Sequence, residues 1–342
     1  EPHVVGAHSK VRRLFGLPTA PPRAAGGVPC TLCANECRIG KNDRGYCGLR
    51  ANTDGTFSSP TSADEAALYY YLDAQVTNCC AAWFCPAGTG AGYPNYACRS
   101  GPEIGYYNLA IFFYGCNFDC LFCQNESHKR LEEAPRCSVD TLVSTTMANK
   151  RISCWCFFGG SPEPQLPFAN ASSKVMLESK PVGRILRICF EWNGAGNLIL
   201  VDRAAELSLR SGGNIKFDLK CSSDTVSRAL SGVSNRRSFE NFDRLFTKFG
   251  GERPSLPLLT ATTLLVPGYV DEVEVEEIAK FLARLDEEIP YSLLIFHPDF
   301  MMNDLPVTPY RQVQDCYRAA TRHLRRVNVG NLATLGIRSW VA

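Results

Sequence analysis

The chain has 342 residues, enough to bury a sizeable core in one large domain or in a large domain with a smaller one attached. Its 36 Lys and Arg residues nearly balance its 34 Asp and Glu residues and form no basic block, so charge gives no reason to expect nucleic acid as a partner. No apolar run approaches the ~20 residues that cross a bilayer, and the first residues lack the apolar core of a secretion signal. We therefore expect a cytoplasmic protein with no membrane partner.

Cysteine is unusually frequent, with 17 residues, and most of them lie in short-spaced groups. Such grouping in a long chain favours metal binding in a reducing compartment, whereas disulfide frameworks are typical of small secreted proteins. Four isolated cysteines are expected to be small buried residues of the core: Cys137, Cys189, Cys221 and Cys316.

Two groups of cysteines precede residue 105. The first has the spacing C-x2-C-x3-C-x9-C and consists of Cys30, Cys33, Cys37 and Cys47. Four thiolates suit a structural zinc ion or an iron–sulfur cluster, and the spacing does not choose between them. The second group is less regular and consists of Cys79, Cys80, Cys85 and Cys98. Adjacent cysteines rarely bind one metal together, because successive side chains of extended backbone point apart. Either one of the adjacent pair only packs, or the two groups share a site, so we treat residues 1–105 as a cysteine-rich metal-binding region.

From residue 106 to 342, apolar runs of strand length alternate with helical patterns. The runs cover residues 107–114, 152–158, 185–192, 214–220, 258–266 and 291–297. Residues 271–288 have apolar positions at helical spacing, with Asp271 and Glu274 predicted to form a capping box. Residues 201–213 predict a second helix that stops at Gly212 and Gly213. This alternation predicts βαβ units and a parallel sheet, either open or forming most of a barrel.

Unusual polar residues follow five of the six runs, at their carboxyl ends. They include Glu191, Asp218, Lys220 and His297. In parallel α/β folds the loops at that edge carry the active site. Turn residues always follow strands, which explains Gly and Pro there but not these four side chains. Each of them alone also fits an ordinary structural role, so the prediction depends on their common placement.

The sequence YGCNFDCLFCQN places Cys116, Cys120 and Cys123 directly after the first run. Thiolates select iron–sulfur clusters, zinc or copper. Three cysteines leave one iron of a 4Fe–4S cluster free for another ligand. A zinc ion held by these thiols and His128 is the alternative.

With Phe122 before its last cysteine, this CxxxCxxC segment resembles the radical SAM superfamily. Four later segments resemble motifs of that superfamily in the same order: GGSPEP (159–164), DLK (218–220), LLVPGYVDEVEVEEIAKFL (264–282) and FHPDFMMNDLPVTP (296–309). With CTLCANECRIGKNDRGYCGLR (30–50), the chain is similar to pyruvate formate-lyase activating enzymes and to AmmeMemoRadiSam-system proteins. The resemblance implies a partial (β/α)6 barrel, of the TIM type, after the cysteine-rich region.

The resemblance also implies the site. The three cysteines would hold a 4Fe–4S cluster whose open iron binds S-adenosylmethionine. The residues expected to bind that cofactor are Phe122, Gly159, Gly160, Ser161, Glu163, Glu191, Asn193, Asp218, Lys220 and His297. Many relatives carry an acidic residue after the two glycines, where this chain has Ser161. That departure leaves the backbone contacts of Gly159 and Gly160 possible, and it leaves open whether Glu163 replaces the missing carboxylate.

The activity implied is that of an anaerobic oxidoreductase. A flavodoxin or ferredoxin would supply an electron, S-adenosylmethionine would be cleaved reductively, and a 5′-deoxyadenosyl radical would abstract hydrogen from a substrate, with no side chain needed as a general base. The substrate is a glycine of a partner glycyl radical enzyme or, as the alternative, a small molecule, cofactor or RNA. A non-enzymatic iron–sulfur or zinc protein would explain the thiols but not the later motifs. Because Asp218 and Lys220 are two residues apart, we expect both to point into the barrel, with Leu219 pointing out.

Overall fold

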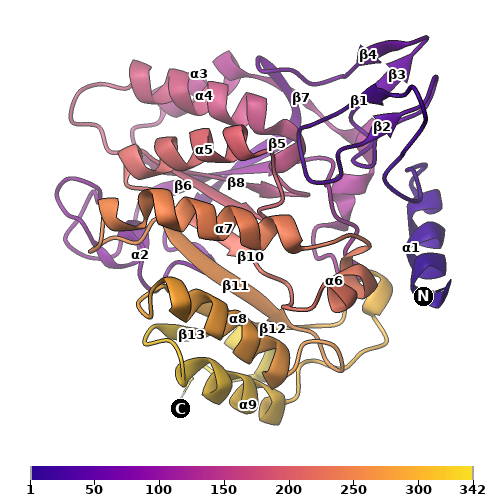
Figure 1. Ribbon diagram of the computed structural model, residues 1–342. Helices are drawn as coiled ribbons and strands as arrows, with labels where there is room; N and C mark the ends of the chain where they lie inside the picture. The colour runs from indigo at the N-terminus through magenta and orange to yellow at the C-terminus, as the bar shows by residue number, and fades with distance from the viewer. Residues whose placement is uncertain (1, 341–342) are drawn as a thin grey trace.

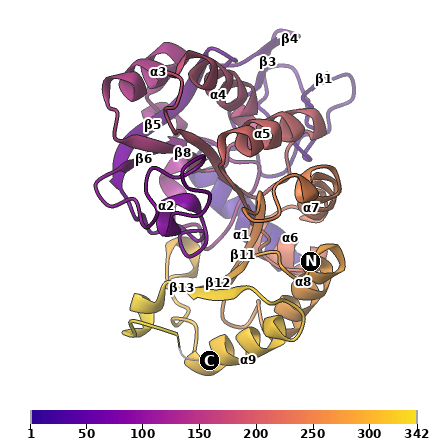
Figure 2. The same cartoon turned by 90° about the vertical axis from the view of Figure 1, so that its left-hand side faces the viewer.

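The computed structural model describes residues 2–340, and its central feature is a curved sheet of nine strands in the order β13-β12-β11-β10-β9-β8-β6-β5-β7 (Figures 1 and 2). Seven neighbouring strands are parallel: β6 (Tyr107–Phe113), β8 (Ile152–Gly159), β9 (Arg187–Trp192), β10 (Ile215–Asp218), β11 (Leu259–Leu265), β12 (Tyr291–Ile295) and β13 (Val327–Gly330). The first six of them are the predicted runs, each within two residues at either end. The predicted partial barrel is therefore confirmed, and β13 extends it by one strand.

Antiparallel strands complete the sheet at the β6 edge. β5 (Glu65–Ala74) pairs with β6 and also with β7 (Arg136–Ser138). The sheet thus takes a ten-residue strand from before residue 105, where the sequence pattern predicted only a cysteine-rich region. The division of the chain at residue 105 stays a prediction.

Helices cover one face of the parallel strands (Figure 1). They are α3 (Val139–Ala148), α4 (Leu166–Ser179), α5 (Leu198–Ser211), α7 (Arg236–Phe249), α8 (Glu272–Leu285) and α9 (Tyr310–Thr321), with the shorter α6 (Asp224–Ser231) after β10. The core beneath them is aromatic, because alternate positions of the strands carry large rings. The ring centroids of Phe190 and Trp192 are 5.1 Å apart, those of Trp192 and Phe217 5.5 Å, and those of Phe217 and Phe242 5.0 Å.

The two predicted helices are confirmed as α5 and α8, and their ends explain their lengths. Gly212 ends α5 with φ of 81°, a left-handed conformation that glycine adopts without strain. Asp271 caps α8 by accepting hydrogen bonds from the backbone N–H groups of Val273 and Glu274. The predicted capping box is incomplete, because the Glu274 carboxylate instead accepts from the backbone of Ser222, at 2.6 Å, in the loop after β10.

The amino-terminal region packs around this sheet. It contains α1 (Pro2–Leu14), the two-stranded sheets β1 (Val28–Pro29) with β2 (Arg38–Ile39) and β3 (Ala51–Thr53) with β4 (Thr56–Ser58), and the four-residue α2 (Pro86–Thr89). Short 3-10 helices occur at Glu126–Lys129 (η1), Leu131–Glu133 (η2), Glu163–Gln165 (η3), Gly250–Glu252 (η4), Phe300–Met302 (η5) and Leu332–Leu335 (η6). None of the described helices is long and apolar enough to span a membrane.

Residues 75–105, which contain α2, lie against the inner face of the barrel and are called here the inner segment. A fully buried ion pair holds this segment to the sheet: the guanidinium of Arg187 on β9 donates to both carboxylate oxygens of Glu103, at 2.8 and 2.6 Å. Ser153 on β8 donates to the same carboxylate at 2.6 Å. Such a paired and fully hydrogen-bonded arrangement offsets the cost of burying two charges.

Candidate active site

A cavity of about 170 Å³ opens at the carboxyl ends of the parallel strands and is called here the cofactor cavity. Eleven of the predicted site residues line it: Cys116, Cys120, Phe122, Cys123, Gly159, Gly160, Ser161, Glu191, Asn193, Asp218 and Lys220. Two predicted cofactor ligands, Glu163 and His297, are not among its lining residues. These residues come from the loop after β6 and from the carboxyl ends of β8, β9 and β10 with the loops that follow them. The topology of the sheet therefore brings together residues that are far apart in the sequence.

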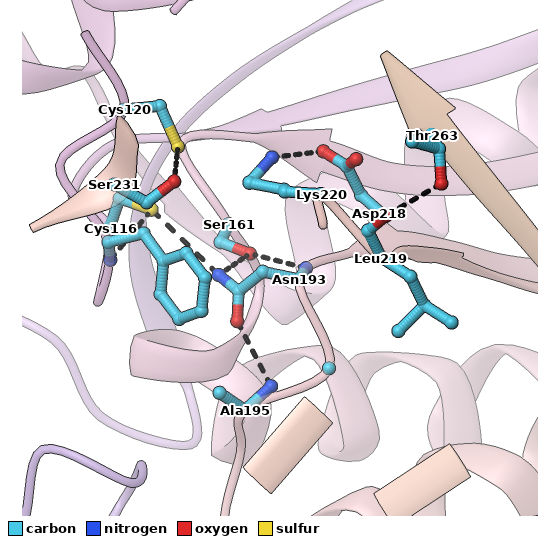
Figure 3. A network of polar contacts seen from close by, with 12 residues as sticks. Cys116, Cys120, Ser161, Asn193, Ala195, Asp218, Leu219, Lys220, Ser231 and Thr263 are labelled. Carbon is cyan, nitrogen blue, oxygen red and sulfur yellow. Dashed lines mark hydrogen bonds and ion pairs between the residues drawn. The ribbon is translucent and has the colours of Figure 1, made fainter. Parts of the chain in front are cut away.

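The loop with the three cysteines begins at Gly115, where φ is 80° and an added Cβ would lie 2.7 Å from the Leu49 side chain. The chain then turns back, and the backbone N–H of Phe118 donates to the sulfur of Cys116 at 3.3 Å. Farther along, backbone hydrogen bonds tie the loop to the end of α6, and the sulfur of Cys120 lies 3.3 Å from the Ser231 hydroxyl (Figure 3). The thiols are therefore held in place by backbone contacts on both sides.

Asp119, between the cysteines, anchors the loop from behind. Its carboxylate is fully buried and contacts His8 at 2.9 Å, Arg12 at 3.3 Å and Lys129 at 2.6 Å. Burial alone would raise the pKa of Asp119, but the His8 hydrogen bond and the charges of Lys129 and Arg12 hold it well below its usual range. Sequence reasoning missed this residue, because nothing in the motif links it to the helix α1 more than 100 residues earlier.

The two glycines after β8 bring backbone close to the cysteine loop. Gly159 has φ of 109°, and a Cβ on Gly160 would lie 2.3 Å from the carbonyl oxygen of Gly115. Any larger residue at position 160 would push the two loops apart. The close approach leaves backbone rather than side chain facing the cavity, which suits contact with a small cationic or polar group.

Glu163 is held behind the cavity. Its carboxylate accepts hydrogen bonds from the Ser161 hydroxyl and, at 2.6 Å, from the backbone N–H of Gly194. Asn193 donates to the Ser161 hydroxyl at 2.9 Å (Figure 3). Ser161 lines the cavity, and Glu163 contacts it from behind. Burial raises the pKa of Glu163 to about 7. In this arrangement Glu163 positions Ser161, and the prediction that it contacts the cofactor itself stays untested.

Asp218 and Lys220 form the ion pair that the alternation of side chains predicts (Figure 3). Both line the cofactor cavity, while Leu219 is buried in the apolar core. The Lys220 ammonium also lies 5.4 Å from the centre of the Phe122 ring. Burial alone would lower the pKa of Lys220, but the Asp218 carboxylate raises it above its usual range. The side chain is therefore a fixed positive charge at neutral pH.

His297 does not itself line the cofactor cavity, and its role in binding the cofactor stays a prediction. Its Nε2 lies 2.9 Å from the side-chain nitrogen of Gln124, just after the last cysteine of the loop. It thus reaches the cofactor cavity through Gln124, which does line it. His128 also lines the cavity, where its buried Nδ1 has no hydrogen-bond partner within the described residues. Burial lowers the pKa of His128 well below its usual range, so the ring is neutral.

A second cavity of about 210 Å³ lies deeper in the barrel and is called here the inner cavity. It shares four lining residues with the cofactor cavity: Asn125, Phe158, Glu191 and Lys216. Five cysteines line it: Cys79 and Cys85 from the inner segment, and Cys154, Cys156 and Cys189 from β8 and β9. Cys189 is buried as predicted, but it belongs to this thiol-lined cavity rather than to the apolar core.

The adjacent cysteines of the inner segment do converge. The sulfurs of Cys79 and Cys80 and a carboxylate oxygen of Glu191 lie within 4.8 Å of one another. The expectation that the two side chains point apart is wrong here, because residues 79–82 form a turn, in which the N–H of Ala82 donates to the carbonyl of Cys79. Cys98, from the same predicted group, lies elsewhere, with its backbone N–H donating to Glu103 at 2.8 Å.

The first cysteine group surrounds a small cavity of its own. Cys30, Cys33, Cys37 and Cys47 all line a space of about 10 Å³ beside Tyr46 and Arg50. Burial raises the pKa of Cys33, and the neighbouring thiols raise it further. The four thiols line one small space, but among the described residues no three of their sulfurs all lie within 4.8 Å of one another. A zinc ion or an iron–sulfur cluster shared by these four therefore stays a prediction.

The donor set of the cofactor cavity fits an iron–sulfur cluster. Within residues 2–340, Cys116, Cys120 and Cys123 do not form a set of sulfurs that all lie within 4.8 Å of one another, with or without His128. A single zinc ion with bonds of ~2.3 Å would draw them closer than this. Three thiols spaced around one cavity instead suit a larger group with one corner free of protein ligands.

Comparison with known proteins agrees with this geometry. A family model described as "Radical SAM superfamily" matches residues 110–282, just over half of the chain. An uncharacterized protein of Methanocaldococcus jannaschii is 24% identical over 323 residues, which cover 89% of this chain and 81% of that protein.

Two solved structures are also similar. Streptococcus suis SuiB, bound to the precursor peptide SuiA, has a TM-score of 0.47 and 12% identity over 64% of this chain and 47% of SuiB. This chain thus matches about half the length of SuiB. A domain of a pyruvate-formate lyase-activating enzyme from Bacteroides vulgatus has a TM-score of 0.40 and 20% identity over 52% of this chain and 98% of that domain. Together with the three-cysteine loop, the family match shows that this chain belongs to the radical SAM superfamily.

Proposed function

We propose that this chain is an enzyme that abstracts a hydrogen atom from a substrate bound in the inner cavity. When bound at Cys116, Cys120 and Cys123 and reduced by a flavodoxin or ferredoxin, a 4Fe–4S cluster would supply the one electron that cleaves S-adenosylmethionine to methionine and a 5′-deoxyadenosyl radical. The observation that carries the proposal is the contact between the two cavities, which share Glu191 and Lys216 as lining residues. A radical formed in one cavity would therefore need to travel only a short way to a substrate in the other.

The residues of the cofactor cavity have separate tasks in this proposal. The thiols of the three cysteines bind the cluster, and the backbone at Gly159 and Gly160 leaves room for the amino group of the cofactor. Lys220 supplies a fixed positive charge for the carboxylate of the cofactor, and Asp218 accepts hydrogen bonds from the ribose hydroxyls of the cofactor. These assignments agree with the placement of all these groups along one cavity.

Apolar side chains would protect the radical. Phe122, Phe158, Leu264 and Leu294 line the cofactor cavity between its polar groups. Excluding water strengthens the electrostatic contacts inside a site and prevents side reactions of reactive intermediates. The hydrogen abstraction itself is chemistry of the cofactor, so the protein contributes binding, orientation and exclusion of solvent.

A small molecule is the substrate class that the inner cavity supports. Its volume of about 210 Å³ is bounded by the inner segment, which is held to the sheet by the buried Glu103–Arg187 pair. Within the described residues, the side-chain oxygens of Asn108 and Asn214 are buried there without a hydrogen-bond partner. Buried polar atoms are nearly always paired, so each of these two oxygens would gain a partner if its side chain turned toward a polar substrate in the cavity.

A glycine of a partner glycyl radical enzyme is the second candidate substrate. It is favoured by the resemblance to activating enzymes of DLK (218–220) with the later Ser-Gly-Val-Ser-Asn stretch (231–235), and of residues 264–282. A flavodoxin or ferredoxin would be the electron donor for either substrate. Formation of a stable glycyl radical in a co-purified protein, seen by electron paramagnetic resonance, would support this candidate over a small molecule.

The test of the proposed function is cleavage of S-adenosylmethionine by the anaerobically reconstituted, dithionite-reduced protein. We expect slow formation of 5′-deoxyadenosine without added substrate. Methylthioadenosine as the main product would contradict the proposal, and so would a protein that carries a full cluster but forms no 5′-deoxyadenosine.

A further inference from the structure

Three potential metal ligands converge at the boundary between the two cavities. The sulfurs of Cys79 and Cys80 and a carboxylate oxygen of Glu191 all lie within 4.8 Å of one another. Among the residues that the structure describes, no other three Cys, His, Asp or Glu side chains have ligand atoms that all lie within 4.8 Å of one another. Tetrahedral zinc, with bonds of ~2.3 Å to sulfur and ~2.1 Å to oxygen, holds its ligand atoms about 3.5–4 Å apart. Small side-chain movements would therefore bring all three atoms to one ion.

The backbone of the inner segment presents the two sulfurs together. The N–H of Cys79 donates to the carbonyl of Thr77 at 2.8 Å, and the N–H of Ala82 donates to the carbonyl of Cys79 at 2.9 Å. The N–H of Ala81 donates to the sulfur of Cys79 at 3.5 Å. This is the same contact, between residues two apart, that the N–H of Phe118 makes with Cys116 in the cluster loop. Such N–H contacts stabilise a thiolate and orient it toward a metal.

This turn is fixed to the opposite side of the barrel. The carbonyl of Cys80 accepts from the Ser292 hydroxyl at 2.8 Å and from the Trp83 indole N–H at 3.1 Å. Ser292 is on β12, whereas Glu191 is on β9. The proposed ligands thus come from two parts of the chain that are each anchored to the sheet, as a rigid metal site requires.

Charge balance explains the lysine at this position. Lys216 is fully buried, and its ammonium lies 3.4 Å from the sulfur of Cys79 and 3.6 Å from the Glu191 carboxylate. Two thiolates and one carboxylate carry three negative charges. A divalent ion and Lys216 together carry three positive charges, so the group as a whole is neutral. Buried charges that are not compensated in this way destabilise the folded state.

We propose that Cys79, Cys80 and Glu191 bind a zinc ion whose fourth coordination position faces the inner cavity. Zinc is preferred because two thiolates and one carboxylate suit its tetrahedral coordination, and three protein ligands with one open position are typical of zinc that binds a substrate or water. The next step of this inference rests on the proposed function. The open position of the zinc ion would bind a carboxylate, amine or thiolate of the substrate and so hold the substrate beside the cofactor cavity. Cys85 and Cys98, which the sequence grouped with this pair, are not ligands.

Metal analysis of anaerobically purified protein tests this site. The variant Cys79→Ser/Cys80→Ser should lose about one zinc ion per chain relative to the wild type, with iron and acid-labile sulfide unchanged. The matched control Cys98→Ser should keep that zinc, because Cys98 comes from the same predicted group but lies elsewhere. Unchanged zinc in the double variant overturns the proposal. Loss of sulfide in that variant also overturns it, because sulfide would mean an iron–sulfur cluster.

A measurement on the wild type covers the case in which the double variant does not fold. Alkylation followed by peptide mass spectrometry should show Cys79 and Cys80 protected in the purified protein and reactive after zinc is removed by a chelator. Equal reactivity before and after chelation, or a disulfide at either residue in anaerobic protein, contradicts the site. Wild-type protein that cleaves S-adenosylmethionine but holds no zinc here refutes this inference alone, whereas zinc without cleavage refutes the proposed function alone.

Discussion

The cofactor cavity and the inner cavity lie side by side in one barrel, but the sequence encodes them in different ways. The cofactor cavity is built from short contiguous motifs, each of which follows a strand. The inner cavity is built from side chains in the middle of strands, such as Cys156 and Lys216, and from the turn at Cys79. The comparison shows that loop motifs identify a site by themselves, whereas an inward-facing site appears only when the register of the strands is known.

The largest expected effect is the loss of the cluster from the cofactor cavity while the inner cavity stays intact. Changing Cys116, Cys120 and Cys123 together to Ala should remove the iron and sulfide of one cluster and abolish formation of 5′-deoxyadenosine, because no other thiols line that cavity among the described residues. Iron and sulfide assays give the measurement, with Cys316→Ser, a buried cysteine of the core, as the control.

The same triple variant should retain the metal of the first cysteine group. Cys30, Cys33, Cys37 and Cys47 surround a separate cavity, so their zinc or iron should survive the loss of the cluster. A triple variant with neither zinc nor iron would leave these four as packing residues. If the triple variant has the same iron content as the wild type, the cluster is not bound by the CxxxCxxC loop.

The next largest effect should be on stability, where loss of the buried Asp119 carboxylate should cost more than loss of a carboxylate in an ion pair near the surface. Asp119→Asn leaves His8, Arg12 and Lys129 buried without their common carboxylate, which should cost about 3–5 kcal/mol of unfolding free energy. Denaturant unfolding of this variant should be compared with that of Asp202→Asn. Asp202 pairs with Arg244 and Lys248 near the surface, so its loss should cost ~1 kcal/mol or less. Equal costs for the two variants would mean that Asp119 does not anchor the loop.

Both regions show how far the sequence alone leads. The six runs of strand length and the helices α5 and α8 were predictable, because side-chain periodicity and helix caps are local. The antiparallel strand β5 was not, since its pairing with β6 depends on contacts between distant parts of the chain. In the site, eleven residues of the motifs reach one cavity.

Other residues of the two cavities could be identified only from the structure, although the sequence contained a signal for some of them. Cys154 and Cys156 are two residues apart on a strand, and so are Lys216 and Asp218, which places each pair on one face. Nothing local signals Asp119, because two of its three partners, His8 and Arg12, come from α1. The turn that brings Cys79 and Cys80 together was also hidden, since adjacent residues were assumed to be extended.

Stability should depend on pH through Glu163. Its pKa is raised by burial to about 7, from an ordinary value of 4.5, so the folded state binds more protons than the unfolded state between these values. The free energy of unfolding should therefore fall by up to about 3 kcal/mol as pH rises from 4.5 to 7. Glu163→Gln should remove that slope in melting temperature against pH. A variant with the same slope as the wild type would show that another group is responsible.

Affinity for S-adenosylmethionine should separate residues inside the cofactor cavity from those beside it. Lys220→Met should weaken binding about 10- to 100-fold, the usual effect of losing a hydrogen bond to a charged group. Asp218→Asn should weaken cofactor binding less, because this substitution also frees the Lys220 ammonium from its ion pair with Asp218. His297→Gln should have the smallest effect, since His297 acts through Gln124. Titration calorimetry at constant cluster content gives these values, and an equal loss for all three would contradict the difference in placement.

The central claim is that the cluster and S-adenosylmethionine occupy the same cavity. Electron paramagnetic resonance of the reduced protein tests this directly, because a ligand on the open iron alters the signal of the cluster. We predict a changed signal when S-adenosylmethionine is added to the wild type, and a change that needs about 10- to 100-fold more cofactor in Lys220→Met. A signal that stays the same while calorimetry shows the cofactor bound would place it elsewhere and contradict the account.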